Sequence, residues 1–183
     1  MKTQSKSKEY LRSCILVAIF ASIIAVCSFI AIPSPIPFTL QSLAIFSALT
    51  ILGGKRGLIS IILYIMLGII GLPVFSGFSG GIGHLFGATG GYIWGFIFTA
   101  LVYLVITRIF NDSVKFQAVG LVSGLLVCYI SGTTWYTAVY LGELSAEAFF
   151  SSLTVCVVPF LIPDIVKIIL SILICRKLSA TKG

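Results

Sequence analysis

Charged residues are scarce in this chain of 183 residues, because Asp, Glu, Lys and Arg together make up only 9% of it. Soluble domains carry roughly 25% charged residues. Among the charged residues the acidic ones are fewer, with five Asp and Glu compared with twelve Lys and Arg. Hydrophobic residues make up 58% of the chain, and the mean hydropathy is +1.16. This composition excludes a soluble globular domain and indicates an integral membrane protein.

Motifs for catalysis and for metal or nucleotide binding are missing as well. The sequence has no HExxH, no GxSxG and no GxxxxGK[ST], so it indicates neither a hydrolase nor an ATPase. The five cysteines are scattered through apolar stretches without a CxxC pair, which is typical of packing residues. His84 is the only histidine, and we expect a loop residue there rather than a metal ligand. We expect no metal and no cofactor in this chain.

Long apolar runs fill the sequence, and a membrane-spanning helix needs about 20 such residues. We predict an all-α integral membrane protein, with one domain of six transmembrane helices over residues 1–183. The expected spans are 13–32, 38–53, 57–75, 89–108, 116–141 and 149–177. The breaks between them are PSPIP (33–37), GGKRG (53–57), a glycine-rich outer loop (76–91), RIFNDSVK (108–115) and GELSAEA (142–148). The first apolar run, residues 15–32, exceeds the usual core of a signal peptide, so we expect it to be retained.

The basic residues predict how the chain crosses the membrane. If the N-terminus is cytoplasmic, the inner segments hold every basic residue except Lys167, and the outer loops hold Glu143 and Glu147. The positive-inside rule expects this distribution. We therefore place the basic segment 1–12 and the C-terminal segment 176–183 in the cytoplasm, on either side of a cytoplasmic (inner) membrane domain. Because the basic residues form no single patch, we expect the lipid bilayer and not nucleic acid as their partner.

The stretch IPDIVKIIL (162–170) contains two charged residues deep inside a predicted span. Asp164 and Lys167 each cost about 2.5–3.5 kcal/mol at a helix centre on insertion scales. Such residues usually face a cavity or a partner. The alternative is an i,i+3 pair that neutralises itself within the helix. We favour a binding site at Asp164 and Lys167.

Two prolines precede this pair and predict a broken helix. Proline is tolerated in the first turn of a helix and disrupts its interior. We expect the last spanning helix to begin near Pro163, and residues 145–158 to form a short outer helix. A helix N-terminus at membrane depth would favour anions. The site would then suit a small ligand with a carboxylate at one end and amide-like N–H groups at the other.

Three further features are candidates for binding. The glycine-rich stretch 71–92 could cover a ligand, with Phe75, Phe78 and Phe86 over an apolar ring, or it could be a flexible outer loop. Thr39 and Gln41 are polar residues at the outer end of the second span. The first span carries a stripe of small residues, which allows another helix to approach closely, within this chain or in a partner. That stripe consists of Ala18, Ala21, Ser22 and Ala25.

Several motifs together resemble the BioY family, the biotin-binding S-components of energy-coupling-factor (ECF) vitamin transporters. They are PFTLQ (37–41), GLPVF (71–75), TGGY (89–92) and PDIVK (163–167), and the resemblance covers nearly the whole chain. It implies a six-helix membrane protein that binds biotin from outside for uptake across the membrane. It also implies an EcfT scaffold and two ATPase subunits as partners, which alone use ATP.

The resemblance also implies site residues. Asp164 and Lys167 match the Asp-x-x-Lys of the family, and we assign Asp164 to the ureido N–H groups of biotin and Lys167 to its carboxylate. The stripe on the first span matches the face that S-components present to the scaffold. The implied biotin site consists of Asp164, Lys167, Gln41, Phe75, Gly80, Gly81, Thr89, Gly90 and Tyr92.

Three other interpretations remain open at this point. The chain could be an S-component for another small vitamin. It could be an integral-membrane enzyme that uses Asp164 as a general base, although the neighbouring Lys167 would lower the pKa of that carboxyl. It could also be a structural subunit without any ligand.

Overall fold

The computed structural model describes residues 2–32, 36–143 and 145–180, with side chains from residue 6 onward, and nearly all of this chain is helical. A 3₁₀-helix, η1 (Ile82–Phe86), precedes α4, and a π-helical turn, η2 (Tyr136–Tyr140), extends α5. Two short strands, β1 (Ala31–Ile32) and β2 (Phe38–Thr39), pair antiparallel. The α-helices are α1 (Lys2–Phe29), α2 (Gln41–Leu52), α3 (Gly54–Ile69), α4 (Gly90–Phe110), α5 (Val114–Trp135), α6 (Ala146–Cys156) and α7 (Val158–Ala180).

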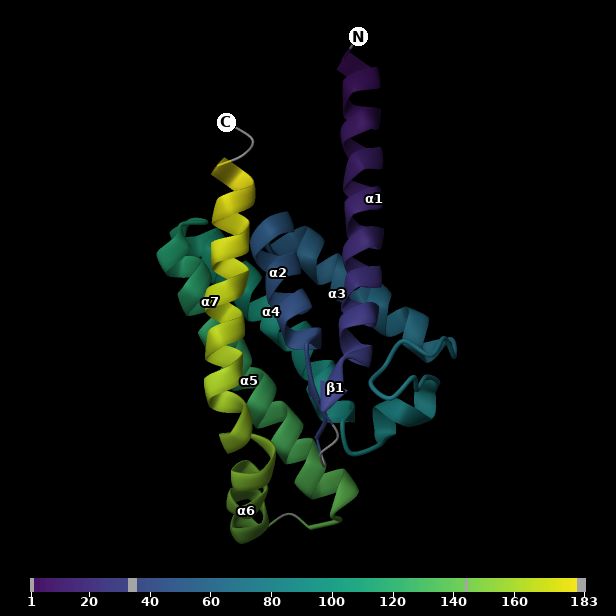
Figure 1. Cartoon of the computed structure of the whole chain (residues 1–183), viewed down its shortest axis with the longest axis vertical. Coiled ribbons are helices and arrows are strands. Elements are labelled where there is room, and N and C mark those ends of the chain that lie inside the picture. Colours follow the sequence, from purple (N-terminus) through teal and green to yellow (C-terminus); the bar gives the residue numbers. More distant parts are fainter. Residues whose placement is uncertain (1, 33–35, 144, 181–183) are drawn as a thin grey trace.

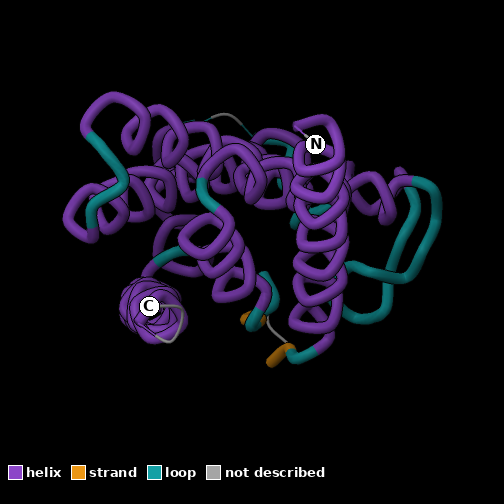
Figure 2. Tube along the Cα trace, turned by 90° about the horizontal axis from the view of Figure 1, so that it is seen from above, coloured by secondary structure: helices purple, strands orange, loops and turns teal. Residues whose placement is uncertain are grey.

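The helices form one bundle in which both ends of the described chain lie on the same side. Figure 1 shows the N-terminal end of α1 and the C-terminal end of α7 at the top, with α6 and the β1–β2 pair toward the opposite end. Seen from above, α7 stands apart from α1 (Figure 2), and α2 packs against both of them. α4 and α5 pack at close range. A Cβ atom at Gly95 would collide with Cys128, and one at Gly124 would collide with Thr99, so only glycine fits at these positions. Small residues permit such an approach between membrane helices.

Four helical stretches in the described residues are long and apolar enough to cross a membrane. They are Lys6–Phe29, Gly90–Phe110, Val114–Tyr140 and Val158–Ala180. Large apolar side chains project outward from all four, including Ile15, Val105, Ile130 and Ile165. Exposed apolar surface of this extent is rare on soluble monomers and suits contact with lipid. The predicted class, a helical membrane protein, agrees with this structure.

The predicted count of six helices differs from the seven α-helices of the described chain. The predicted spans 38–53 and 57–75 correspond to α2 and α3, which have 12 and 16 residues. At 1.5 Å per residue they reach about 18 and 24 Å, short of the roughly 30 Å hydrocarbon core. The last predicted span, 149–177, is divided between α6 and α7. Of the predicted break at 33–37, residues 33–35 lie outside the described part of the chain.

The predicted helix start near Pro163 is wrong. The chain breaks at Val157 (φ −125°, ψ −49°), and α7 continues from Val158 through Pro163 without interruption. Pro159, not Pro163, occupies the first turn, where a missing N–H costs nothing. Pro163 removes a single hydrogen bond to the carbonyl of Pro159. Asp164 and Lys167 therefore lie well inside α7, and the expected helix N-terminus at their depth is absent from this described segment.

The short helix expected over residues 145–158 is present as α6 (Ala146–Cys156). Ser145 caps it, because its hydroxyl oxygen accepts a hydrogen bond from the backbone N–H of Ala148 at 3.1 Å. Serine at this position satisfies one of the free N–H groups of the first turn. α6 thereby connects the segment that follows α5 and η2 to the start of α7.

Candidate functional site

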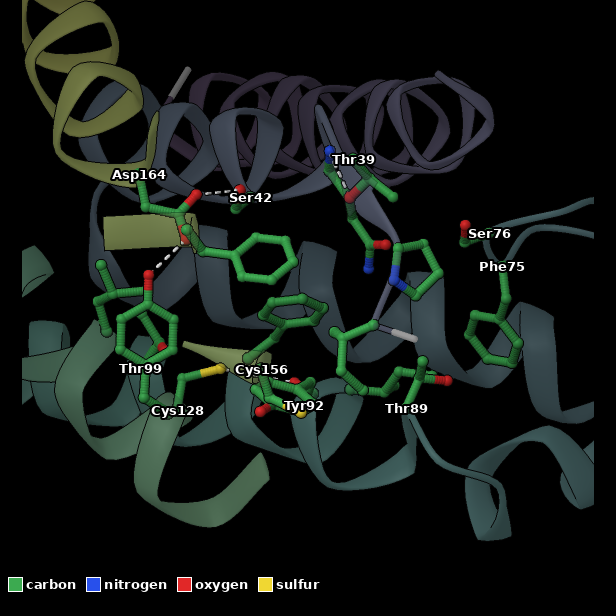
Figure 3. A pocket seen from close by; sticks show the side chains of 18 of the residues that line it. Thr39, Ser42, Phe75, Ser76, Thr89, Tyr92, Thr99, Cys128, Cys156 and Asp164 are labelled. Carbon is green, nitrogen blue, oxygen red and sulfur yellow. Dashed lines mark hydrogen bonds between the residues drawn. The ribbon is translucent and has the colours of Figure 1, made fainter. Parts of the chain in front are cut away.

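A cavity lies inside the bundle, between the helices and the glycine-rich segment. Its volume is about 90 Å³, enough for several water molecules, since one water needs roughly 10–15 Å³ in this measure. Residues from α2, α3, α4, α5, α6 and α7 line it, together with β2 and the segment between α3 and α4. Figure 3 shows Asp164 and Ser42 at one end and Phe75, Ser76 and Thr89 at the other. The cavity is therefore elongated, with polar groups at both ends.

Asp164 and Lys167 form the polar centre of the first end. They lie three residues apart on α7 and both are 5% exposed. Lys167 Nζ lies 2.8 Å from Asp164 Oδ1, so the pair forms within the helix. It also lines the cavity. The two readings of the sequence, an intrahelical pair and a cavity wall, are thus compatible.

Every proton of the Lys167 ammonium is used inside the protein. Besides Asp164, Nζ donates to the backbone carbonyl of Thr39 at 2.8 Å and to Ser42 Oγ at 2.9 Å. An ammonium has three donors. The Phe38 ring lies 4.2 Å from Nζ and adds a cation–π contact. A ligand carboxylate can reach Lys167 only by replacing one of these bonds.

Asp164 retains room for one more hydrogen bond. Its Oδ1 accepts from Ser42 Oγ at 3.1 Å and from Lys167, and its Oδ2 accepts from the Tyr129 hydroxyl at 2.7 Å. A carboxylate offers about four acceptor positions. One position on Oδ2 is therefore open to a donor from a ligand.

The opposite end is built from aromatic and hydroxyl side chains of the glycine-rich segment. Phe75 is 1% exposed and meets Tyr64 edge-on at 5.6 Å and the His84 ring in a stack at 5.2 Å. His84 Nε2 lies 3.2 Å from Thr89 Oγ1 and 3.5 Å from Ser79 Oγ. Partial burial lowers the pKa of His84 below its usual value, because it disfavours the charged ring. This end therefore carries neutral groups at neutral pH.

The glycine-rich segment is an ordered cover and not a featureless loop. The N–H of Gly81 donates to the carbonyl of Gly68 at 2.7 Å, and the N–H of Phe75 donates to the carbonyl of Ser79 at 2.9 Å. Trp135 Nε1 donates to the carbonyl of Gly87 at 3.0 Å. These bonds tie the segment to α3 and α5. It lines the cavity on the side of Phe75.

Most of the residues predicted for the site come together at this cavity. Asp164, Lys167, Gln41, Phe75, Thr89 and Tyr92 all line it. The three glycines do not belong to its described lining. Gly81 adopts φ +89°, and a Cβ at Gly80 or Gly90 would collide with the carbonyl of Leu72 or Leu85. Gly80, Gly81 and Gly90 thus shape the cover instead of lining the cavity.

Two of the three phenylalanines expected over the ligand point elsewhere. Phe78 is 67% exposed and stacks on Phe29 at 4.4 Å, and Phe86 is 62% exposed. Phe78 sits at the tip of the turn between Phe75 and Ser79 with φ +55°, which turns its side chain away from the cavity. Of the three, only Phe75 lines the described cavity.

Ser42, Tyr129, Tyr64 and Phe38 are site residues that the sequence did not reveal. Ser42 follows the predicted Gln41 directly and could have been included with it. Tyr129 lies in the middle of a long apolar span, and no local pattern distinguishes it from a packing residue. The tyrosine hydroxyl is a polar atom in a span, which is the only signal that the sequence offers.

The small-residue stripe on α1 is divided by the structure. Ala18 and Ser22 are exposed, whereas Ala21 and Ala25 are 1% and 8% exposed and pack into the core. At 3.6 residues per turn the four side chains cover an arc of about 100°, and the edge of the core crosses that arc. The expectation of one exposed face is therefore wrong for Ala21 and Ala25. A shallow groove remains along Ala18, Ile19, Ser22, Ile23, Val26 and Cys27.

Comparisons with known proteins agree with the fold. The family model described as the BioY family matches residues 1–182. A "Probable biotin transporter BioY" of Pyrococcus horikoshii is 37% identical over 164 residues, covering 89% of this chain and 93% of that protein. The "Biotin transporter BioY" of Thermotoga maritima is 35% identical over 169 residues, covering 92% of this chain and 96% of that protein.

Among solved structures, an S-component for biotin from an ECF-type ABC transporter superposes with a TM-score of 0.82. It is 26% identical and the match covers 94% of this chain and 93% of that one. The S component of another bacterial ECF transporter has a TM-score of 0.58 at 16% identity, over 95% of this chain and 99% of that one. The second match bears on the fold alone.

The fold defines a multi-pass membrane protein of the S-component class. Within this class, the chain belongs to the BioY family. The family is one of transporter components and not of enzymes, so the interpretation of Asp164 as a general base is not retained.

Proposed function

We propose that this protein binds biotin in the cavity between Asp164 and Phe75 and acts as the substrate-specific S-component of an ECF-type transporter for biotin uptake. The observation that carries the proposal is the open acceptor position on buried Asp164, within a cavity whose remaining lining is mostly apolar and aromatic. A buried carboxylate selects a ligand that brings N–H donors. The ureido group of biotin carries two such donors beside an apolar bicycle. A second vitamin as ligand has no observation in its favour.

Energised uptake requires partners. The sequence contains no nucleotide-binding motif, so ATP would be used by two ECF ATPase subunits through an EcfT scaffold. The scaffold would bind α1 along the groove that contains Ala18 and Ser22, whose small side chains permit a close approach. Biotin is the ligand of this chain, and the chain itself holds no cofactor.

We place the protein in the cytoplasmic membrane as a single six-span domain, with both termini in the cytoplasm. Lys6 lies near the start of α1 and Lys177 in the last turn of α7. These two helix ends lie on the same side of the bundle (Figure 1), which supports this orientation. The positive-inside rule makes this the cytoplasmic side. α6 and the glycine-rich segment would then face outward, where biotin arrives.

Equilibrium binding of labelled biotin to the purified protein in detergent tests the proposal. Wild type should bind tightly, and Asp164→Ala and Lys167→Ala should each weaken binding a hundredfold or more, about 2.7 kcal/mol. Unlabelled vitamins serve as competitors, and only biotin should displace the label. Folded wild-type protein that does not bind biotin would refute the assignment. If wild type binds tightly and neither variant weakens binding, biotin remains the ligand, but Asp164 and Lys167 are not part of its binding site.

A further inference from the structure

The outward face of the cover is apolar. The cover here means residues 71–89, the part of the glycine-rich segment that lies between α3 and α4. Each exposed residue in this range is a glycine, a proline or a large apolar residue. The large ones are Leu72, Phe78, Ile82 and Phe86. The polar side chains of the cover are only partly exposed, and they are Ser76, Ser79, His84 and Thr89. An exposed apolar patch marks an interaction surface.

A second connection, which joins η2 to α6, has a different surface. Its exposed residues include Glu143, Ser145 and Glu147. Figure 1 shows it beside α6 at the lower end of the bundle, whereas the cover lies beside the C-terminal end of α1. Residues 57–107, which include the whole cover, contain no Asp, Glu, Lys or Arg. The charged side chains that are typical of a surface in water thus occur at one connection and not at the other.

The length of α3 sets the depth at which the cover begins. α3 carries the exposed Lys55 and Arg56 in its first turn, and the positive-inside rule puts this end at the cytoplasmic surface. Its 16 residues reach about 24 Å, less than the roughly 30 Å hydrocarbon core. Figure 1 shows α3 running obliquely to α1 and α7, so it crosses less than its full length. The cover therefore begins before the chain has left the hydrocarbon.

The hydrogen bonds of the cover suit this depth. Irregular backbone is tolerated inside a membrane where the protein satisfies its polar groups or where it lines a cavity. The N–H of Phe75 donates to the carbonyl of Ser79, and the N–H of Gly81 donates to the carbonyl of Gly68. The Ser79 hydroxyl donates to the carbonyl of Ser76 at 2.7 Å. These polar groups are bound within the protein, and the inner side of the cover lines the cavity.

The apolar face of the cover is continuous with a membrane-spanning helix. Phe78 stacks on Phe29, the last residue of α1, with the ring centroids 4.4 Å apart. Ile30, directly after Phe29, is exposed as well. The stretch Lys6–Phe29 is one of the four in the described residues that are long and apolar enough to cross a membrane. Lipid around this end of α1 therefore also reaches Phe78.

We propose that the outward face of the cover, with Phe78, Ile82 and Phe86, lies in lipid, in the outer leaflet of the orientation given above. Lipid acyl chains fit this face, because it carries no charge and the short α3 holds it at their depth. Movement of the cover away from the cavity must then displace lipid, and a polar ligand does not enter across this face. The inference concerns the outer surface and does not depend on which ligand the cavity holds.

Fluorine NMR of the full chain in lipid nanodiscs, without biotin, tests the proposal. Phe78 or Phe86 is replaced by para-trifluoromethylphenylalanine, with a single label in each sample. The label at Val105, which is exposed on α4, is the control for lipid, and the label at Glu143 is the control for water. Each disc holds a single copy of the chain, so a second copy cannot cover the face.

Two paramagnetic probes are compared on each sample. One is a phospholipid with a nitroxide near the headgroup end of its acyl chain, and the other is a water-soluble gadolinium chelate. The measured quantity is the line broadening by the lipid probe divided by that by the gadolinium chelate. We expect this ratio at Phe78 and Phe86 to be close to the ratio at Val105 and far above the ratio at Glu143.

A ratio at Phe78 and Phe86 that lies closer to that of Glu143 would put the cover in water and overturn the inference. Signals that neither probe broadens would mean that protein covers this face, which also overturns it. If one labelled protein does not fold, the other decides. A failure of the proposed function is distinguished by a separate measurement, because wild type that does not bind biotin would leave these ratios unchanged.

Discussion

The two ends of the cavity contain similar residue types but differ in how their hydrogen-bonding groups are satisfied. At the Asp164 end, side chains from α2, α5 and α7 and a backbone carbonyl of β2 hold one another in a closed network of hydrogen bonds. At the Phe75 end, the cover is held by backbone hydrogen bonds and ring contacts, and the Tyr64 hydroxyl, which lies beside Ser28, has no partner within hydrogen-bond distance among the described residues. The first end keeps one acceptor position, on Asp164 Oδ2, for a donor from a ligand. The two ends thus differ in the group that they leave available, an acceptor at the first and a donor at the second.

The largest expected effect comes from breaking the ion pair. Lys167→Met should lower the free energy of unfolding by about 3–5 kcal/mol, because it leaves the buried charge of Asp164 without its partner. The double variant Asp164→Asn/Lys167→Met should recover most of this loss, since no unpaired charge remains. Thermal unfolding in detergent compares the three proteins. Equal stability of the single and double variants would mean that the pair is not buried as described.

The same chemical change at the two ends should have unequal effects on the empty protein. Tyr129→Phe removes a donor to Asp164 at 2.7 Å, and we expect a loss of about 1.5–3 kcal/mol in the free energy of unfolding. Tyr64→Phe removes a buried hydroxyl that has no partner within hydrogen-bond distance among the described residues, and should raise the free energy of unfolding by about 1–3 kcal/mol. The free energy of unfolding of both variants is measured in the absence of biotin. A larger loss for Tyr64→Phe would show that its hydroxyl is satisfied after all.

The cover depends on one close contact. A Cβ at Gly68 would overlap the Phe75 ring, so Gly68→Ala should displace that ring and destabilise the protein by about 1–3 kcal/mol. Biotin binding should weaken as well, because Phe75 lines the cavity. Gly83→Ala is the control, since nothing lies within 4 Å of its Cβ position. Binding and thermal unfolding of the two variants should separate them clearly, and similar behaviour would contradict the packing of Phe75.

The smallest effect concerns pH. Because burial lowers the folded-state pKa of His84, the unfolded chain takes up its proton first as the pH falls. The stability contributed by the neutral ring is therefore fully present above about pH 6.5, the ordinary pKa of histidine, and is lost as the pH falls through the lowered value. Melting temperatures from pH 8 to pH 5 should fall more for wild type than for His84→Phe. Parallel curves would remove His84 from this role.

Part of this site could be predicted from the sequence, and the reason is energetic. Asp164 and Lys167 can be recognised in the sequence, because a charge inside a membrane span costs free energy and usually has a functional role. The hydroxyls of Ser42, Tyr129 and Tyr64 carry no such penalty, and similar residues serve ordinary helix packing in membranes. Their roles follow only from distances across the bundle.

The helix boundaries show the same division. The apolar runs located the long helices, since length and hydropathy decide whether a segment can span. The start of α7 could not be fixed, because Pro159 and Pro163 both satisfy the rule for a helix start and only tertiary packing selects between them. Phe78 lies in a turn and is itself left-handed, which no hydrophobic pattern predicts.

The short β1–β2 pair connects α1 to the hydrogen-bond network of Lys167 and Asp164. β1 follows α1 directly, Ala31 pairs with Thr39, and the N–H of Leu40 donates to the carbonyl of Ile30 at 3.1 Å. The carbonyl of Thr39 is also an acceptor of Lys167. A displacement of α1 would therefore act, through this strand pair, on a carbonyl that accepts a hydrogen bond from Lys167. If a partner that grips α1 favours one position of this linkage, it must favour or oppose ligand occupancy to the same degree that the ligand favours or opposes the partner.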